Sequence, residues 1–184
     1  MKNLICITLF SLLTTAHSQF NKEVTLVDGR KFLVGQLTLD GIKTEPYKLW
    51  YDQGHKTYEI DRTLINFFKK ELSNHEIKLF LGTWCGDSKR QVPRIIKILE
   101  AAEFPMEQLE IVALDRRKEF YKKSPTGEEQ GLNIIKVPTL IFLKNDKEVN
   151  RIVERPIESL EEDMNAILNL KNYIPNYAHL KRTR

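Results

Sequence analysis

Along the middle of the chain, apolar runs of strand length alternate with a segment of helical period. The runs IKLFLGTW (77–84) and LEIVALD (109–115) contain few polar positions, which is typical of strands buried on both faces. Between them, apolar residues at i, i+3, i+4 and i+7 from Val92 predict a helix from Cys85 to about Ala102. The order strand, helix, strand predicts two parallel strands joined by a right-handed crossover.

The C-terminal half shows the pattern of a hairpin followed by a helix. The runs VPTLIFL (137–143) and KEVNRIVE (147–154) flank the turn Asn145-Asp146. PIESLEEDMNAILNL (156–170) then has an apolar side formed by Ile157, Leu160, Met164 and Ile167. Joined to the first half by a long charged connection, 116–133, these elements predict an α/β domain with a central mixed sheet and helices on both faces.

The N-terminal third is predicted to contain a hairpin and one amphipathic helix. EVTLVDGRKFLVGQLT (23–38) places two apolar stretches around Asp28-Gly29, which is a common hairpin dipeptide. Asp61 is a favourable N-cap, so we expect a helix over 61–72 that packs on the core. The predicted apolar side of this helix consists of Leu64, Phe67, Phe68 and Leu72.

An aromatic segment, EPYKLWYDQGHKTYEI (45–60), separates the hairpin from the helix. It has no clear hydrophobic period and is predicted to be irregular. Its large side chains either cover the core or line a groove, and covering the core is the more ordinary role. These side chains are Tyr47, Trp50, Tyr51 and Tyr58.

The first 18 residues are expected to be removed from the mature protein. MKNLICITLFSLLTTAHS combines Lys2, a short apolar run and the small-residue site Ala16-His17-Ser18, as secretory signal peptides do. Cleavage after Ser18 leaves Gln19 as the first residue. A membrane anchor is the alternative, although the apolar run is short for a bilayer. Cys6 precedes the apolar core, which argues against a lipoprotein, so we expect an exported protein, periplasmic or secreted, without stable membrane insertion.

Length and net charge limit the number of domains and the class of binding partner. The mature chain, 19–184, suits one domain with extensions. The full chain has a formal net charge of +4, and part of this surplus lies in the terminal HLKRTR. A positive surplus can indicate nucleic-acid binding. Because an exported protein rarely meets nucleic acid, we assign these charges to solvated surface and expect no nucleic-acid partner.

Cys85 is the single cysteine of the mature chain, which therefore has no internal disulfide. A lone thiol in an oxidising compartment is either buried as a small hydrophobe or used in chemistry. The predicted junction of strand and helix favours use, because free backbone N–H groups and the helix dipole stabilise a thiolate there. Lys89 and Arg90 add to this effect, whereas the carboxylate of Asp87 opposes it.

The residues around the single cysteine resemble the active-site segment of the thioredoxin superfamily. In TWCGDS, Trp84 precedes the candidate nucleophile and Gly86 follows it, while Pro93 has the spacing of that family's kinked helix. KVPTLIFLKNDKEV resembles the segment that carries the family's cis-proline, which maps to Pro138. RIVERPIESLEEDM is similar to its last strand and helix. The resemblance covers residues 72–170 and implies a thioredoxin-like fold.

The resemblance also implies the roles of site residues. In the family, the cysteine attacks a substrate disulfide, the proline packs beside its sulfur, and the backbone before the proline pairs with the substrate chain. Carried over, the catalytic positions are Cys85 and Ser88, and the substrate-binding residues are Trp84, Gly86, Asp87, Val137, Pro138 and Thr139. The implied partners are protein thiols and disulfides together with an external thiol reductant, and no cofactor is implied.

Two departures from the family pattern affect the mechanism. Ser88 stands at the position of the resolving cysteine, and Leu79 replaces a buried acid. A hydroxyl cannot release a mixed disulfide, so a thiol of the substrate (isomerase-type chemistry) or a small external thiol (monothiol reduction) must do so. Ser88 can instead donate a hydrogen bond to the thiolate. The connection 116–133 is longer than in a minimal thioredoxin, and residues 19–71 are not explained by the family pattern.

Other chemistries receive less support. The histidines His55, His75 and His179 are scattered, which disfavours a zinc site and a Cys–His protease. We therefore expect no metal. Thr83, two residues before the cysteine, faintly resembles peroxidatic sites, so a peroxidase that oxidises Cys85 to a sulfenic acid stays an alternative.

The sequence thus predicts an exported, monothiol, thioredoxin-like protein that exchanges thiols and disulfides through a Cys85 mixed disulfide, and it is expected to be a monomer. The alternative is a non-catalytic binding module that keeps the proline groove, which Ser88 and Leu79 favour. The predicted division of the chain is a signal peptide (1–18), an extension packed on the core (19–71), a thioredoxin-like domain (72–170) and a C-terminal tail with a frayed end (171–184).

Overall fold

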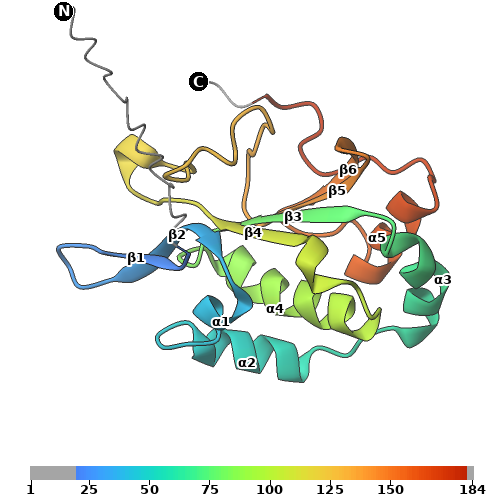
Figure 1. The fold of residues 1–184 in the computed structure, drawn as a ribbon, viewed down its shortest axis with the longest axis horizontal. Helices are drawn as coiled ribbons and strands as arrows, with labels where there is room; N and C mark the ends of the chain where they lie inside the picture. Colours follow the sequence, from blue (N-terminus) through green and yellow to red (C-terminus); the bar gives the residue numbers. More distant parts are fainter. Residues whose placement is uncertain (1–19, 182–184) are drawn as a thin grey trace, which may run out of the picture.

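The computed structural model describes residues 20–181, which form a six-stranded mixed sheet with helices (Figure 1). The strands are β1 (Lys22–Thr25), β2 (Lys31–Leu37), β3 (Glu76–Leu81), β4 (Leu109–Ala113), β5 (Thr139–Lys144) and β6 (Lys147–Val153). They lie in the order β1-β2-β4-β3-β5-β6 across the sheet. The predicted signal peptide, 1–18, lies outside the described residues.

Five α-helices accompany the sheet. They are α1 (Leu39–Ile42), α2 (Lys48–Thr57), α3 (Arg62–Leu72), α4 (Gly86–Ala101) and α5 (Leu160–Leu168), with short 3-10 turns η1 (Met106–Gln108) and η2 (Lys118–Phe120). As predicted, β3 and β4 are parallel neighbours joined through α4, and β5 and β6 form an antiparallel hairpin. Among residues 20–181, no helix is both long and apolar enough to cross a membrane.

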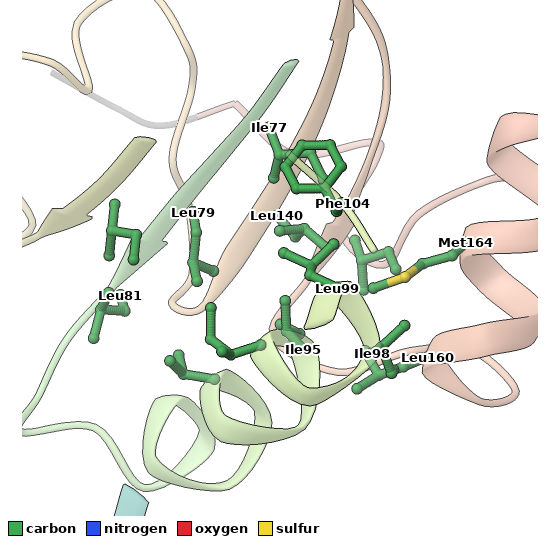
Figure 2. Close-up of a cluster of buried hydrophobic side chains, with 14 of the residues drawn as sticks. Ile77, Leu79, Leu81, Ile95, Ile98, Leu99, Phe104, Leu140, Leu160 and Met164 are labelled. Carbon is green, nitrogen blue, oxygen red and sulfur yellow. The ribbon is translucent and has the colours of Figure 1, made fainter. Parts of the chain in front are cut away.

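β3 is buried on both faces, as its apolar density predicts. Ile77, Leu79 and Leu81 point toward α4, where they meet side chains of that helix and of α5 (Figure 2). Phe80 points the other way and joins a second apolar cluster. Leu79, at the position where the family carries a buried acid, is fully buried among apolar residues.

The α-helices pack on one face of the sheet, so the prediction of helices on both faces is wrong. Figure 1 shows α2, α3 and α4 on one side and the connection between β4 and β5 on the other. This connection brings Ile134 and Val137 over Phe80. It stays irregular because it lacks an apolar period and is held by polar contacts: the amide and hydroxyl of Ser124 donate to the carboxylate of Glu129 at 3.0 and 2.7 Å.

The aromatic segment contains a helix, α2, where the sequence predicted irregular structure. Tyr51 is the buried residue of this helix, so the helix has little apolar period for sequence analysis to detect. α2 packs closely on α4: a Cβ added at Gly54 would lie 2.5 Å from Cγ of Pro93. The four large aromatic side chains of the segment belong to the core cluster or pack against it, so the prediction that they cover the core is confirmed.

The N-terminal hairpin and α3 form as predicted, with one correction. β1 and β2 pair around Asp28-Gly29, and β2 then pairs with β4, so the hairpin extends the main sheet. Asp61 caps α3 by accepting a hydrogen bond from the amide of Leu64 at 3.0 Å. The buried side of α3 is formed by Ile65, Phe68 and Leu72, whereas Phe67 is 68% exposed. The prediction is confirmed for Phe68 and Leu72, and Leu64 packs against the core, but Ile65 takes the place of Phe67 on the buried side.

The closing helix is shorter than predicted. Ser159 is its N-cap and accepts a hydrogen bond from the amide of Glu162 at 3.1 Å, so α5 begins at Leu160. Ile157 lies before the helix and is 49% exposed, which corrects its assignment to the apolar side. The residues that follow α5, as far as 181, pack back on the domain: Asn150 donates to the carbonyl of Tyr173 at 3.0 Å.

A buried carboxylate connects the N-terminal third to α5. Glu161, 2% exposed, accepts hydrogen bonds from the hydroxyl of Tyr58 at 2.7 Å and from the amide of Asp61 at 3.2 Å. Both donors precede α3 in the chain, so this single side chain fixes the start of α3 on the closing helix.

We expect Glu161→Ala to lower the free energy of unfolding by about 1–3 kcal/mol, because two donors lose their acceptor in a buried site. Urea denaturation measures this change. Glu158→Ala, which removes an exposed carboxylate just before the same helix, is the matched control and should change the free energy by less than about 0.5 kcal/mol. Equal effects of the two substitutions would contradict the role of Glu161.

Candidate functional site

Cys85 occupies the N-cap of α4, just beyond the carboxyl end of β3. Its backbone is extended, with φ −92° and ψ 129°. Its amide donates to the carbonyl of Gly82 at 2.8 Å, and its carbonyl accepts from the amide of Lys89 at 3.0 Å. Cys85 is a free cysteine, and the residue is half-buried. The structure therefore places Cys85 at the N-terminus of a long helix, as the sequence predicted.

The thiol meets the segment before β5. The Sγ–H of Cys85 donates to the carbonyl oxygen of Val137 at 3.4 Å. Val137 is buried and precedes Pro138 through a cis peptide bond. The carbonyl of Pro138 in turn accepts from the amide of Glu154 at 2.7 Å. The fold thus brings together three of the residues that the sequence proposed for the site, from segments far apart in the chain.

Trp84 is held in place by a hydrogen bond and by a glycine. Its Nε1–H donates to the carbonyl of Leu114, at the end of β4, at 2.7 Å. A Cβ at Gly82 would lie 2.7 Å from Cε2 of the indole, so only glycine leaves room for this ring position. The ring of Tyr121 lies 5.8 Å from that of Trp84, centroid to centroid.

Ser88 is buried and turned toward the strand rather than the thiol. It is 0% exposed, and its Oγ accepts a hydrogen bond from the amide of Gly82 at 3.1 Å. Among the described residues, no hydrogen bond joins Ser88 to Cys85. The hydroxyl therefore holds the turn that carries the cysteine, which differs from the expected bond to the thiolate.

The other predicted substrate-binding residues differ in their accessibility. Gly86 begins α4 with open space around it. Asp87 forms an ion pair with Arg90 at 2.6 Å, so each charge is partly neutralised by the other. Thr139 is 1% exposed and donates to the carbonyl of Lys136 at 2.7 Å, which directs its hydroxyl into the protein. Thr139 therefore supports the loop rather than a substrate.

Thr83 is also turned away from the sulfur. It is buried, and its Oγ1 accepts a hydrogen bond from the amide of Leu33 in β2 at 3.0 Å. This contact ties the cysteine-bearing turn to the N-terminal hairpin. Because the hydroxyl of Thr83 is directed away from the sulfur, this threonine does not support the peroxidase alternative.

The histidines pair elsewhere. His55 lies 2.6 Å from the carboxylate of Glu100, and Nδ1 of His75 lies 2.8 Å from the carbonyl of Glu71. Within residues 20–181, no group of three or more His, Cys, Asp or Glu side chains is arranged to hold a metal ion.

A small cavity of about 10 Å³ lies beside Pro138 on the helix side of the sheet. Gln91 and Ile95 of α4 line it together with Leu140 and Glu154. Oε1 of Gln91 is buried and lacks a hydrogen-bond partner among the described residues. A cavity of this size holds about one water molecule, so it leaves no room for a ligand.

The sequence did not reveal the residues around Glu154. Its carboxylate forms an ion pair with Lys136 at 3.3 Å and accepts a hydrogen bond from the hydroxyl of Tyr177. Burial by itself raises the pKa of Glu154, but the bonds from Tyr177 and Lys136 outweigh it and hold the pKa below its ordinary value. No local pattern marks these residues, because only the fold brings the C-terminal segment to Pro138.

A family model described as Thioredoxin matches residues 43–166. The matched range begins before α2 and ends within α5, so it contains Cys85, Ser88 and Pro138. A search of curated proteins finds no match.

Several solved structures are similar to this chain at low identity. A Pseudomonas aeruginosa protein of unknown function is 11% identical, with a TM-score of 0.45 over 68% of this chain and 81% of its own. An HIV epitope scaffold is 13% identical, with a TM-score of 0.44 over 68% and 76%. A thioredoxin from Fasciola hepatica is 20% identical, with a TM-score of 0.31 over 50% and 75%. These scores are low, so the match of residues 43–166 carries the assignment.

We expect Gly82→Ala to move the Trp84 indole and to lower the free energy of unfolding by about 1–3 kcal/mol, because the added methyl group overlaps the ring. The indole N–H resonance of Trp84 and urea denaturation report the two effects. Gly86→Ala is the matched control, since its Cβ meets nothing within 4 Å. A shifted indole in the control, or an unshifted one in Gly82→Ala, would contradict this packing.

The lowered pKa of Glu154 predicts a pH-dependent contribution to stability. This contribution is fully present above the ordinary carboxyl value of 4.5 and is lost as pH falls through the folded-state pKa. We expect Glu154→Gln to lower the free energy of unfolding by about 1–3 kcal/mol at pH 7, and by progressively less below the ordinary carboxyl value. Urea denaturation of both proteins over this range measures the difference. A difference independent of pH would refute the assignment, and Glu158→Gln serves as the exposed control.

Proposed function

Because this chain belongs to the thioredoxin family, we propose that it is an exported protein that performs thiol–disulfide exchange on protein substrates through Cys85 alone. One observation carries the proposal. Cys85 is a half-buried residue at the N-terminus of α4, and its sulfur lies 3.4 Å from the carbonyl oxygen of Val137, beside Pro138. A helix N-terminus favours the thiolate, which is the form that attacks a disulfide.

In the first step, the Cys85 thiolate attacks one sulfur of a substrate disulfide. The substrate S–S bond breaks, a new S–S bond joins Cys85 to that sulfur, and the other substrate sulfur leaves as a thiolate that takes a proton from water. The hydrogen bond from Cys85 to Val137 is given up, because the thiol has lost its proton. The incoming chain is proposed to lie along Val137 and Pro138.

The second step requires a thiol from outside the chain, since Ser88 has no sulfur. If another thiol of the substrate attacks the mixed disulfide, the substrate is isomerised with no net oxidation or reduction. If small-molecule or protein thiols attack instead, two of them are oxidised to a disulfide and the substrate disulfide is reduced to two thiols. In both cases Cys85 is regenerated as a thiolate.

The second candidate is a binding module that uses the same groove without turnover. The burial of Ser88 and its bond to Gly82 favour it, because this side chain then serves the turn rather than the chemistry. The apolar surroundings of Leu79 favour it as well, since no acid is present there to move protons.

We expect reduced protein to form a stoichiometric mixed disulfide with an excess of a disulfide-linked peptide, and we expect this adduct to persist until a thiol is added. Intact-mass spectrometry detects it. Cys85→Ser should form no adduct. Ser88→Cys should release the peptide without added thiol, because cysteines three residues apart on a helix lie within disulfide reach.

The matched control is Thr63→Cys, which places a second thiol on the exposed surface of α3. Its adduct at Cys85 should persist like that of the native protein. If reduced native protein forms no adduct while the Cys85→Ser variant still binds the peptide, the binding module is correct and exchange is not.

A further inference from the structure

One flank of the candidate site is formed by aromatic rings and lysines, which we call the rim: Trp84, Tyr121, Lys122, Lys136 and Tyr177. The rings of Trp84 and Tyr121 lie 5.8 Å apart. The ammonium of Lys122 lies 5.1 Å from the Tyr121 ring, and that of Lys136 lies 5.2 Å from the Tyr177 ring. These contacts form two groups, and the hydrogen bond from Lys122 to the carbonyl of Ile135, which directly precedes Lys136, joins them. The members of the rim come from four segments of the chain.

The rim is attached to both halves of the site. Trp84 directly precedes Cys85, and Lys136 directly precedes Val137. Lys122 donates to the carbonyl of Ile135, which fixes its loop to the segment that leads to Pro138. A chain seated along Val137 and Pro138 therefore runs beside the rim.

The charge of this flank is positive. The loop 115–123 contains five basic and two acidic residues, which gives it a net charge of +3. The whole chain of 184 residues has a net charge of +4. Three carboxylates nearby form ion pairs within the protein, and each pair also neutralises one cation. Asp87 pairs with Arg90 at 2.6 Å, Asp115 with Arg117 at 2.6 Å, and Glu154 with Lys136 at 3.3 Å. Lys89, exposed one turn after Cys85, adds a further cation.

We propose that the rim selects acidic segments, so that the substrates of this site are protein chains with carboxylates next to the reacting sulfur. This inference rests on the proposed function for the position of the substrate. Lysine ammonium groups attract carboxylates and repel basic chains, which gives specificity as well as a faster encounter. The aromatic faces contact the apolar parts of the same segment.

The first experiment measures binding without chemistry. The Cys85→Ser variant is titrated into two fluorescent peptides that are identical except that Glu or Lys flanks a central serine, and anisotropy reports the dissociation constants. We expect the acidic peptide to bind at least about tenfold more tightly at low salt, with the difference reduced in 0.5 M NaCl, where the Debye length falls to about 4 Å. Equal binding of both peptides, or a preference that salt does not alter, overturns the proposal.

Charge variants locate the effect. Lys89→Gln should weaken binding of the acidic peptide about threefold or more while leaving the basic peptide unchanged or slightly improved. Lys122→Gln also removes the bond to the carbonyl of Ile135, so its expected result is a preference for the acidic over the basic peptide that falls about threefold or more. Lys70→Gln, on the exposed side of α3, removes the same charge far from the site and should change neither. Circular dichroism confirms that each variant is folded. An effect of Lys70→Gln as large as the others would show that net charge alone is responsible, which overturns the proposal.

A second measurement separates this proposal from the function on which it rests. Native protein is reacted with a neutral pyridyl disulfide, whose rate depends on Cys85 but not on the rim. If Cys85 reacts with this reagent but the acidic and basic peptides bind equally, the proposal of thiol–disulfide exchange stands and the rim proposal is wrong. If Cys85 is inert but the Cys85→Ser variant still prefers the acidic peptide, the rim proposal stands for a binding module.

Discussion

The pairing of β3 with β5 is the constraint on which the site depends. The two strands are antiparallel, with Phe80 opposite Thr139, so the end of β3 and the start of β5 lie at the same edge of the sheet. The turn after β3 therefore delivers Cys85 to the carbonyl of Val137. A one-residue slip would turn every side chain of the strand to the opposite face, so the apolar clusters on both faces protect this register and, with it, the geometry of the site.

The parts of the chain outside the central strands are also tied to this edge. The N-terminal hairpin reaches the cysteine-bearing turn through Leu33 and Thr83. The C-terminal segment reaches the proline loop through Tyr177 and Glu154. Residues that look like extensions in the sequence thus support the site from two sides, and they give it a flank that the core of the fold does not provide.

The structure also changes how the serine at the resolving-cysteine position is understood. In the sequence Ser88 stands at the position of the resolving cysteine, but in the structure its hydroxyl accepts a hydrogen bond from the amide of Gly82 and stabilises the turn before Cys85. The indole of Trp84 is fixed by the carbonyl of Leu114 and by the absence of a side chain at Gly82. The half-buried cysteine is consequently presented by a turn that hydrogen bonds hold on both sides.

The sequence by itself determined the strands β3 to β6, the helix that begins after Cys85 and the candidate pair Cys85 and Pro138, because apolar period, N-cap chemistry and motif spacing are local properties. It could not reveal α2, whose single buried residue leaves no period, nor that Phe67 and Ile157 face solvent. Only the tertiary structure decided the covering of the second face by an irregular connection and the inward turn of Ser88, Thr83 and Thr139. It also decided the meeting of Tyr121 with Trp84 and of Tyr177 with Lys136. These features depend on which distant backbone groups come within hydrogen-bonding distance, and the packing of the sheet, rather than any local pattern, sets those distances.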